Sequence, residues 1–103
     1  MILRWTEQAY LRPAEIHDFI ASDSPENASR LIDRLIARAQ TLLRFPHLGR
    51  KLPELPETDL REIVDGNYRI VYRVRRRAIE VLTVFEAHRL LPTEDLPADP
   101  PSR

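Results

Sequence analysis

A period of 3.6 residues dominates the apolar positions between Ser24 and Arg44. One stripe of this segment is apolar: Ala28, Leu31, Ile32, Leu35, Ile36, Ala39, Leu42 and Leu43. Ser24 is suited to cap a helix and Pro25 to occupy its first turn, whereas Pro46 disfavours helical backbone at the residue before it. The pattern therefore predicts an amphipathic helix that begins after Ser24 and ends near Arg44.

A shorter apolar pattern precedes this helix. Residues 2–5 are rich in apolar side chains and predict a first strand, after which Thr6 can cap the next turn. Pro13 fits the first turn of a helix that runs to about Ser22, and residues 6–12 are expected to form an earlier helical segment, kinked or broken at Pro13. Because only a few residues join the two helices, we expect them to pack as an antiparallel hairpin.

In the second half of the chain, apolar residues recur at about every second position, the spacing typical of strands. Residues 45–58 hold three prolines and are expected to form a loop. Three strands are predicted to follow it. Gly66 and Asn67 are typical of a two-residue hairpin turn, and such a turn pairs Ile63 with Ile70.

A second tight turn is expected at residues 76–77. It pairs Arg73 with Glu80 and Arg69 with Val84, in agreement with the register of the first turn. A slip of one residue in either hairpin would move side chains to the opposite face of the sheet.

The two registers assign the strand side chains to two faces. One face is nearly all apolar and is expected to seat the helix hairpin: Ile63, Tyr68, Ile70, Tyr72, Val74, Ile79, Val81 and Phe85. The other face mixes apolar and charged side chains: Glu62, Val64, Arg69, Val71, Arg73, Glu80, Leu82 and Val84. The sequence thus predicts an α+β domain over residues 1–91, with an N-terminal strand and helix hairpin packed on a small antiparallel sheet.

Composition narrows the class of protein. The chain has 103 residues and no cysteine, which excludes disulfides and cysteine-ligated metals, and its three histidines form no recognisable metal set. No apolar run has the length of a membrane helix, and no secretory signal is recognisable, so we expect a cytoplasmic protein without a cofactor. Residues 92–103 contain four prolines and three acids and are expected to form a flexible tail.

Four segments, in this order and spacing, resemble the RelE/ParE superfamily of toxins from type II toxin–antitoxin systems. They are residues 45–50 (FPHLGR), 60–62 (LRE), 67–74 (NYRIVYRV) and 79–84 (IEVLTV). The Asp-Ser-Pro opening of the second helix, the Pro-x-x-Gly-Arg loop and the Arg-Glu pair look closer to the ParE branch. That resemblance implies a toxin that inhibits DNA gyrase and forms a hetero-oligomer with a cognate ParD-like or RelB-like antitoxin.

Two departures from the family pattern bear on the target. Residues 85–89 read Phe-Glu-Ala-His-Arg, where many ParE-like chains carry a basic or His-Gly stretch. In addition, no tyrosine follows Tyr72, so the tyrosine that RelE toxins use near the C-terminus has no obvious counterpart. Arg69 matches the arginine that RelE nucleases direct at phosphate.

An alternative function is cleavage of mRNA on the ribosome, as in the RelE branch. Attack by a 2′-hydroxyl needs a base, an acid and a cation for the phosphate, roles that Glu86, His88, Arg89 and Arg69 could share. The competing interpretation is that Glu86 and His88 merely end the last strand. A third alternative is a non-toxic member that serves only as a binding partner or co-repressor.

The mixed face also predicts a docking surface. Its apolar residues Val64, Val71, Leu82 and Val84 are expected to lie under an apolar stripe of the antitoxin's C-terminal segment. The acids of that segment would meet the arginines of the surface, namely Arg69, Arg73 and Arg89. For Arg73 the sequence favours a structural pairing with Glu80.

Overall fold

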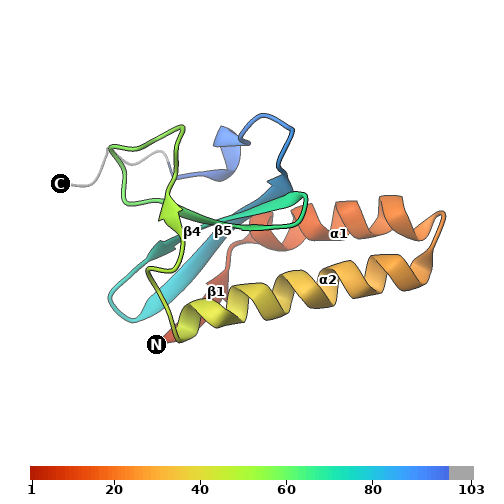
Figure 1. Cartoon of the computed structure of the whole chain (residues 1–103), viewed down its shortest axis with the longest axis horizontal. Helices are drawn as coiled ribbons and strands as arrows, with labels where there is room; N and C mark the ends of the chain where they lie inside the picture. Colours follow the sequence, from red (N-terminus) through yellow and green to blue (C-terminus); the bar gives the residue numbers. More distant parts are fainter. Residues whose placement is uncertain (98–103) are drawn as a thin grey trace.

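A computed structural model describes residues 1–97 and forms two layers, a helix hairpin on one face of a five-stranded sheet (Figure 1). The elements are β1 (Ile2–Trp5), α1 (Glu7–Ala21), α2 (Pro25–Gln40), η1 (Thr41–Leu43), β2 (Arg50–Lys51), β3 (Arg61–Asp65), β4 (Tyr68–Val74), β5 (Ala78–Glu86) and η2 (Thr93–Asp95). The strand order is β1-β5-β4-β3-β2, and β1 runs parallel to β5 while the other neighbours are antiparallel. The predicted α+β class is confirmed, with a mixed rather than purely antiparallel sheet.

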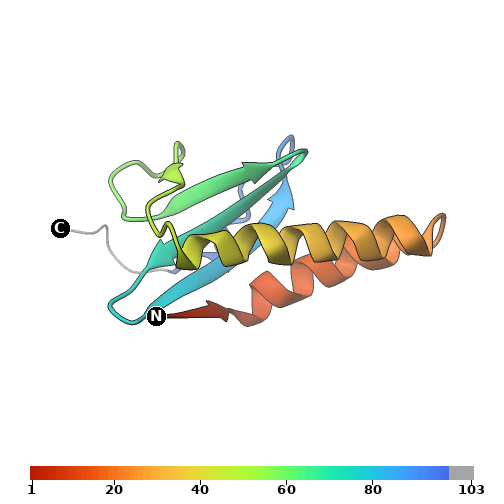
Figure 2. The ribbon, with the colours of Figure 1, turned by 60° about the horizontal axis from the view of Figure 1, so that its bottom comes forward.

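The helix hairpin is longer than the sheet beneath it. Figure 2 shows α1 and α2 crossing the sheet and extending beyond its edge at the turn that joins them. No helix within residues 1–97 is long and apolar enough to cross a bilayer.

Both helices begin at the caps that the sequence indicates. The Thr6 hydroxyl accepts the Ala9 N–H at 3.2 Å, and the Ser24 hydroxyl accepts the Asn27 N–H at 3.3 Å. The expectation that α1 is broken at Pro13 is wrong, because α1 is one continuous helix with Pro13 buried inside it. Proline removes one N–H from the helix, and the packing of α1 against α2 and β5 offsets that loss.

The predicted register of the first hairpin is confirmed. Ile63 lies opposite Ile70, and Gly66 adopts φ +58°, a conformation that favours glycine. One short strand was missed by the sequence pattern, because β2 lies inside the segment predicted as loop and pairs with the start of β3.

The predicted register of the second hairpin holds only near its turn. Arg73 lies opposite Glu80 as expected, but a β-bulge between Val71 and Tyr72 makes Leu82 an extra residue on β5. Arg69 therefore lies opposite Phe85, and the predicted pairing of Arg69 with Val84 is wrong.

The main core lies between the helices and the sheet. It comprises Ala9, Leu31, Leu35, Ala39, Leu42, Ile63, Ile70, Tyr72, Ile79, Val81 and Val84, with Tyr68, Val74 and Trp5 partly buried against it. Because of the bulge, Val84 belongs to this core instead of the mixed face, and Phe85 takes the opposite side. The other side chains predicted to face the helices do so: Ile63, Tyr68, Ile70, Tyr72, Val74, Ile79 and Val81.

Tyr72 ties the loop after the helices to the centre of the sheet. Its buried hydroxyl donates to the Pro46 carbonyl at 2.8 Å and accepts the Gly49 N–H at 2.9 Å. A Cβ atom at Gly49 would lie 2.8 Å from the Tyr72 ring and would also overlap the carbonyl oxygen of Glu62. Glycine is therefore required at this close approach of two backbone segments.

Gly49→Ala is expected to lower the free energy of unfolding by about 1–3 kcal/mol, the usual cost of overpacking a filled site. Urea denaturation of the purified chain measures it. His47→Ala, in the same loop but exposed, is the control and is expected to stay within about 0.5 kcal/mol of the wild type. Equal stability of Gly49→Ala and wild type would contradict the contact.

Candidate functional site

The face of the sheet that points away from the helices is covered by the chain itself. A second set of buried residues, here called the outer cluster, lies on this face: Leu52, Leu60, Val71, Leu82 and Phe85. Leu55, Leu91 and Leu96 pack against it from the loop after β2 and from the C-terminal segment. The expectation of an apolar surface open to a partner is therefore wrong for Val71 and Leu82.

The other two residues predicted for that docking surface are separated from each other. Val84 lies in the main core on the helix side, and the bulge is the reason. Val64 is 48% exposed near the end of β3 and is available to a partner.

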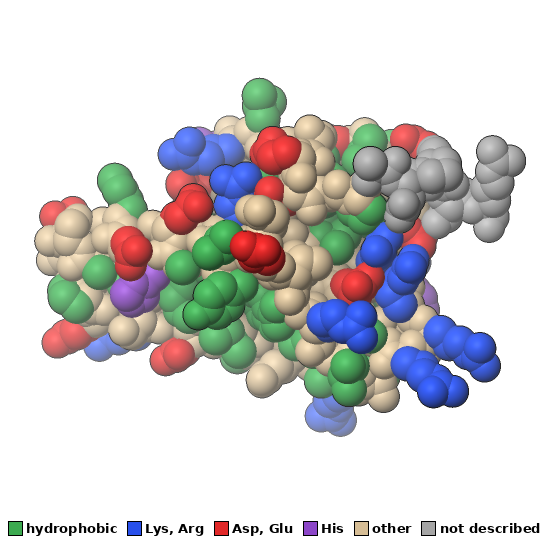
Figure 3. All heavy atoms as spheres, turned by 180° about the vertical axis from the view of Figure 1, so that it is seen from behind, with side chains coloured by type: hydrophobic (Ala, Val, Ile, Leu, Met, Phe, Trp, Pro, Cys, Tyr) green, Lys and Arg blue, Asp and Glu red, His purple; other side chains and the backbone are tan. Residues whose placement is uncertain are grey.

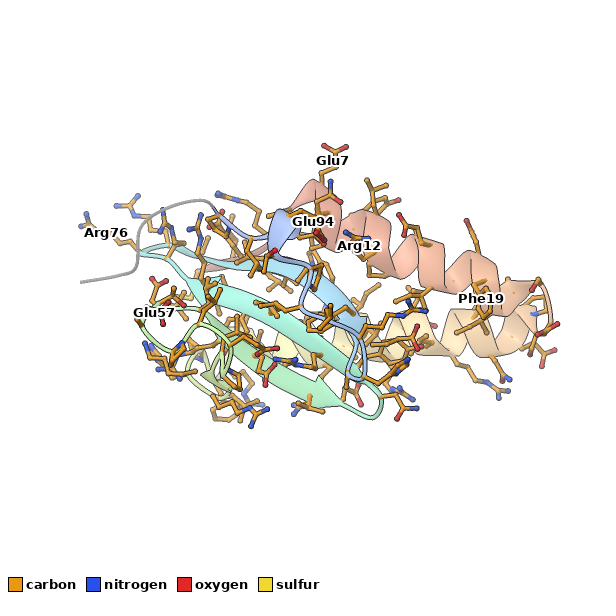
Figure 4. All side chains as sticks on the ribbon, turned by 90° about the horizontal axis from the view of Figure 1, so that it is seen from above. Glu7, Arg12, Phe19, Glu57, Arg76 and Glu94 are labelled. Carbon is orange, nitrogen blue, oxygen red and sulfur yellow. The ribbon has the colours of Figure 1, made fainter. Side chains whose placement is uncertain are left out.

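The C-terminal segment over residues 91–97 is held on the sheet by a buried carboxylate. Asp95, whose side chain is 2% exposed, accepts hydrogen bonds from Arg12 at 2.7 and 3.1 Å and from the Thr83 hydroxyl at 2.9 Å. The hydrogen bond to Asp95 raises the pKa of Arg12, although burial opposes it. Figure 4 shows Glu94 beside Arg12, where the segment reaches α1.

These contacts correct the expectation of a flexible tail for residues 92–97. Four prolines and three acids in residues 92–103 suggested a solvated end, but Leu96 and Asp95 each have a partner on the folded domain. Residues 98–103, to which the same expectation applied, lie outside the described residues.

Arg69 lies among carboxylates, not among the apolar residues that the sequence predicted. Its Nε donates to Glu62, and its two terminal nitrogens donate to the two oxygens of Glu54 at 2.7 Å each. The guanidinium also stacks over the Phe85 ring, 4.8 Å from its centroid. The hydrogen bond to Glu54 raises the pKa of Arg69, against the effect of burial.

Glu62 extends this ion-pair network to the edge of the sheet. Its side chain is 0% exposed and also accepts a hydrogen bond from Arg50 at 2.7 Å. The network fastens β2 and the loop that follows it to β3 and β4. A buried charge of this kind persists only while its partners stay in place.

The candidate nuclease residues do not form one site. His88 Nε2 and Arg89 Nε lie 3.7 and 3.3 Å from the Glu86 carboxylate, so these three side chains are brought together after β5. Glu86 pairs with Tyr68 on the helix side of the sheet, and burial, together with the negative charge of Glu86, raises the pKa of Tyr68. Arg69 lies on the other face beside Phe85, which leaves the exposed trio without the predicted phosphate ligand.

The remaining arginines of the strands have structural contacts. Arg73 donates to Glu80 at 2.7 Å, as the register predicted. Arg61 donates to the Gly49 carbonyl at 2.7 Å. Within the described residues, no group of three His, Asp or Glu side chains could hold a metal ion.

An apolar groove between α1 and α2 was missed by the sequence analysis. It has a volume of about 440 Å³, and it is lined by Trp5, Ala9, Tyr10, Pro13, Ala14, His17, Asp18, Ile32, Leu35 and Ile36. Figure 3 shows apolar side chains gathered over the helix hairpin on this side of the molecule. A prediction of one continuous helix over residues 7–21 would have indicated this groove, because Tyr10, Ala14 and His17 share one face of such a helix.

Glu54 gives the ion-pair network a measurable pH dependence. The hydrogen bond from Arg69 lowers the pKa of Glu54 below its ordinary value of 4.5. The ionised carboxylate therefore stabilises the fold above about pH 4.5, and this contribution is lost as the pH falls through the lowered pKa.

Glu54→Gln is expected to be less stable than wild type by about 1 kcal/mol at pH 7, the discounted value for a partly exposed pair. The difference should close as the pH falls below about 4.5, which chemical denaturation at several pH values measures. Glu57→Gln, exposed in the same loop, is the control and should follow the wild-type profile. A difference independent of pH would contradict the role given to this carboxylate.

Comparisons with known proteins agree on one family. Residues 3–91 match the family described as "ParE toxin of type II toxin-antitoxin system, parDE". "Putative toxin Y4kP" of Sinorhizobium fredii (strain NBRC 101917 / NGR234) is 34% identical over 90 residues, which cover 87% of this chain and 92% of that protein.

A solved structure supports the same fold. A chain of the "Chromosomal ParDE TA system from P. aeruginosa" superposes with a TM-score of 0.69 at 19% identity, covering 85% of this chain and 97% of its own. The overall fold is thus shared with a chain of a ParDE system. With the match over residues 3–91, this chain belongs to the ParE family of toxins from type II toxin–antitoxin systems.

Proposed function

We propose that this toxin inhibits DNA gyrase and is neutralised by a cognate antitoxin in a hetero-oligomeric complex. The observation that carries the proposal is the family match over residues 3–91. Gyrase is preferred to mRNA because the residues that could cleave RNA are divided between two faces of the sheet. Arg69 would also have to leave two glutamates to contact a phosphate.

The RelE-like alternative rests on Glu86, His88 and Arg89. His88 and Arg89 lie 3.7 and 3.3 Å from the carboxylate of the half-buried Glu86. His88 and Arg89 are both exposed on the surface, where water screens their charge. This arrangement is typical of solvated residues that end a strand.

Expression of the toxin without antitoxin is expected to arrest growth with gyrase trapped on cleaved DNA while translation continues. Counting covalent gyrase–DNA complexes and following amino-acid incorporation in the same culture separates the two targets. Glu86→Ala and His88→Ala should remain as toxic as wild type. A translation block that precedes DNA damage, together with loss of toxicity in His88→Ala, would replace gyrase with mRNA as the target.

The antitoxin is proposed to occupy the groove between α1 and α2. The surface first expected to bind it is occupied by this chain's own Leu91 and Leu96, whereas the groove is apolar and open. A groove of about 440 Å³ accommodates several apolar side chains of an amphipathic segment. Membership of a toxin–antitoxin family supplies the partner that such a surface needs.

Ile36→Glu is expected to weaken antitoxin binding by about 30-fold, the value for loss of roughly 2 kcal/mol at a central contact. The charge would be buried in the groove beneath the antitoxin. Titration calorimetry with the neighbour-encoded protein measures the affinity.

Leu43→Glu is the matched control, because Leu43 is 39% exposed and Ile36 is 41% exposed, yet Leu43 lies outside the groove. It should bind as wild type does. Equal affinity of the Ile36 variant and the control would remove the groove from the proposal, while the test of gyrase inhibition would stand.

A further inference from the structure

The turn between β4 and β5 consists of arginine alone. Arg75, Arg76 and Arg77 are exposed and lie between the last residue of β4 and the first residue of β5. Figure 4 places Arg76 at the end of the molecule opposite Phe19, which marks the tip of the helix hairpin. Glycine, asparagine and aspartate are the usual residues of tight hairpin turns, so turn chemistry does not explain three arginines.

Charge around this turn is poorly balanced within the described residues. Glu80 is the carboxylate that faces it, and it is shared by Arg73 at 2.7 Å and by Arg4 and Arg75 at 3.7 Å each. In the described part of the chain, Arg76 and Arg77 have no carboxylate partner within salt-bridge distance. Two guanidinium groups are therefore available to an external anion.

The turn is also held in a fixed position. The Arg75 N–H donates to the Ala78 carbonyl at 2.7 Å, and the Ile2 N–H donates to the Arg77 carbonyl at 3.1 Å. β1 therefore braces the turn from the side, while the paired strands fix its base. A ligand that binds here does not have to order the backbone, which lowers the entropic cost of binding.

The helix hairpin carries a small excess of negative charge. Residues 7–40 contain six acids and four arginines, a difference of −2: Glu7, Glu15, Asp18, Asp23, Glu26 and Asp33 against Arg12, Arg30, Arg34 and Arg38. The whole chain has a formal net charge of 0, so the excess of arginine at the sheet end is compensated at a distance. Figure 3 shows many of the Lys and Arg side chains gathered toward one end of the molecule, whereas the Asp and Glu side chains are spread along its length. This uneven distribution of charge favours approach to a polyanion with the β4–β5 turn leading.

We propose that the β4–β5 turn of the free toxin binds the phosphate backbone of duplex DNA. Arginine binds phosphate bidentately, and a two-stranded ribbon fits the B-DNA major groove, about 12 Å wide. The major groove of an RNA duplex is too narrow to admit it. The contact is independent of gyrase and sequence, and it would bring the toxin to the DNA on which its proposed target acts.

Fluorescence anisotropy with the full chain and a labelled 20-base-pair duplex, from 50 to 200 mM salt, tests the proposal. Two phosphate contacts, from Arg76 and Arg77, predict an affinity that falls about 12-fold over this range, with a slope of roughly −1.8 in log K against log salt. Arg76→Ala/Arg77→Ala is expected to remove nearly all of this slope. Arg76→Lys/Arg77→Lys keeps both charges and should retain most of the wild-type slope.

Arg30→Ala/Arg34→Ala is the matched control, because it removes two exposed positive charges from α2. It should preserve the salt slope of the wild type. The proposal is overturned by absence of DNA binding at 50 mM salt, by an unchanged slope in the Arg76/Arg77 alanine variant, or by binding confined to an RNA duplex. Any of these results leaves gyrase inhibition, measured by trapped cleaved DNA, unaffected.

Discussion

The β-bulge at Leu82 decides which side of the sheet each residue of the last strand faces. Before it, Tyr72 lies opposite Val81, and after it Val71 lies opposite Thr83. One extra residue therefore turns Val84 toward the helices. It also turns Phe85 toward the outer cluster, where the Phe85 ring lies against the guanidinium of Arg69 on β4. The main core, the outer cluster and the ion-pair network all depend on this displacement.

Sequence reasoning succeeded where a local chemical requirement acts. Gly66 adopts a positive φ, and the Gly-Asn turn signal correctly predicted the register of the first hairpin. Ser24 and Thr6 correctly indicated where the two helices begin, because their hydroxyls cap the first turns. It failed at Leu82, because β5 carries apolar residues on both faces and no glycine signals the bulge. Alternation cannot report a register shift when either face accepts the same side chains.

The candidate site was harder to predict, because its contacts join distant segments. Arg12 and Asp95 are separated by 83 positions, and the composition around Asp95 is that of a solvated tail. Glu54 likewise lies in a proline-rich loop, where no periodicity indicates that it reaches Arg69. Ion pairs of this kind follow from the tertiary fold, whereas the strand register alone placed Arg69 opposite the apolar Val84.

The free energy needed to bring an arginine to an external anion differs between Arg69 and the arginines of the β4–β5 turn. Withdrawing Arg69 toward a phosphate would leave Glu62, which has a 0% exposed side chain, with fewer partners in a buried site. Breaking a buried pair of this kind costs about 3–5 kcal/mol, more than a single phosphate contact returns. Arginines at the β4–β5 turn carry no such cost, because water already surrounds them. Binding of an external anion is therefore favoured at the exposed end of the sheet, while the arginines on the strands maintain the shape that presents it.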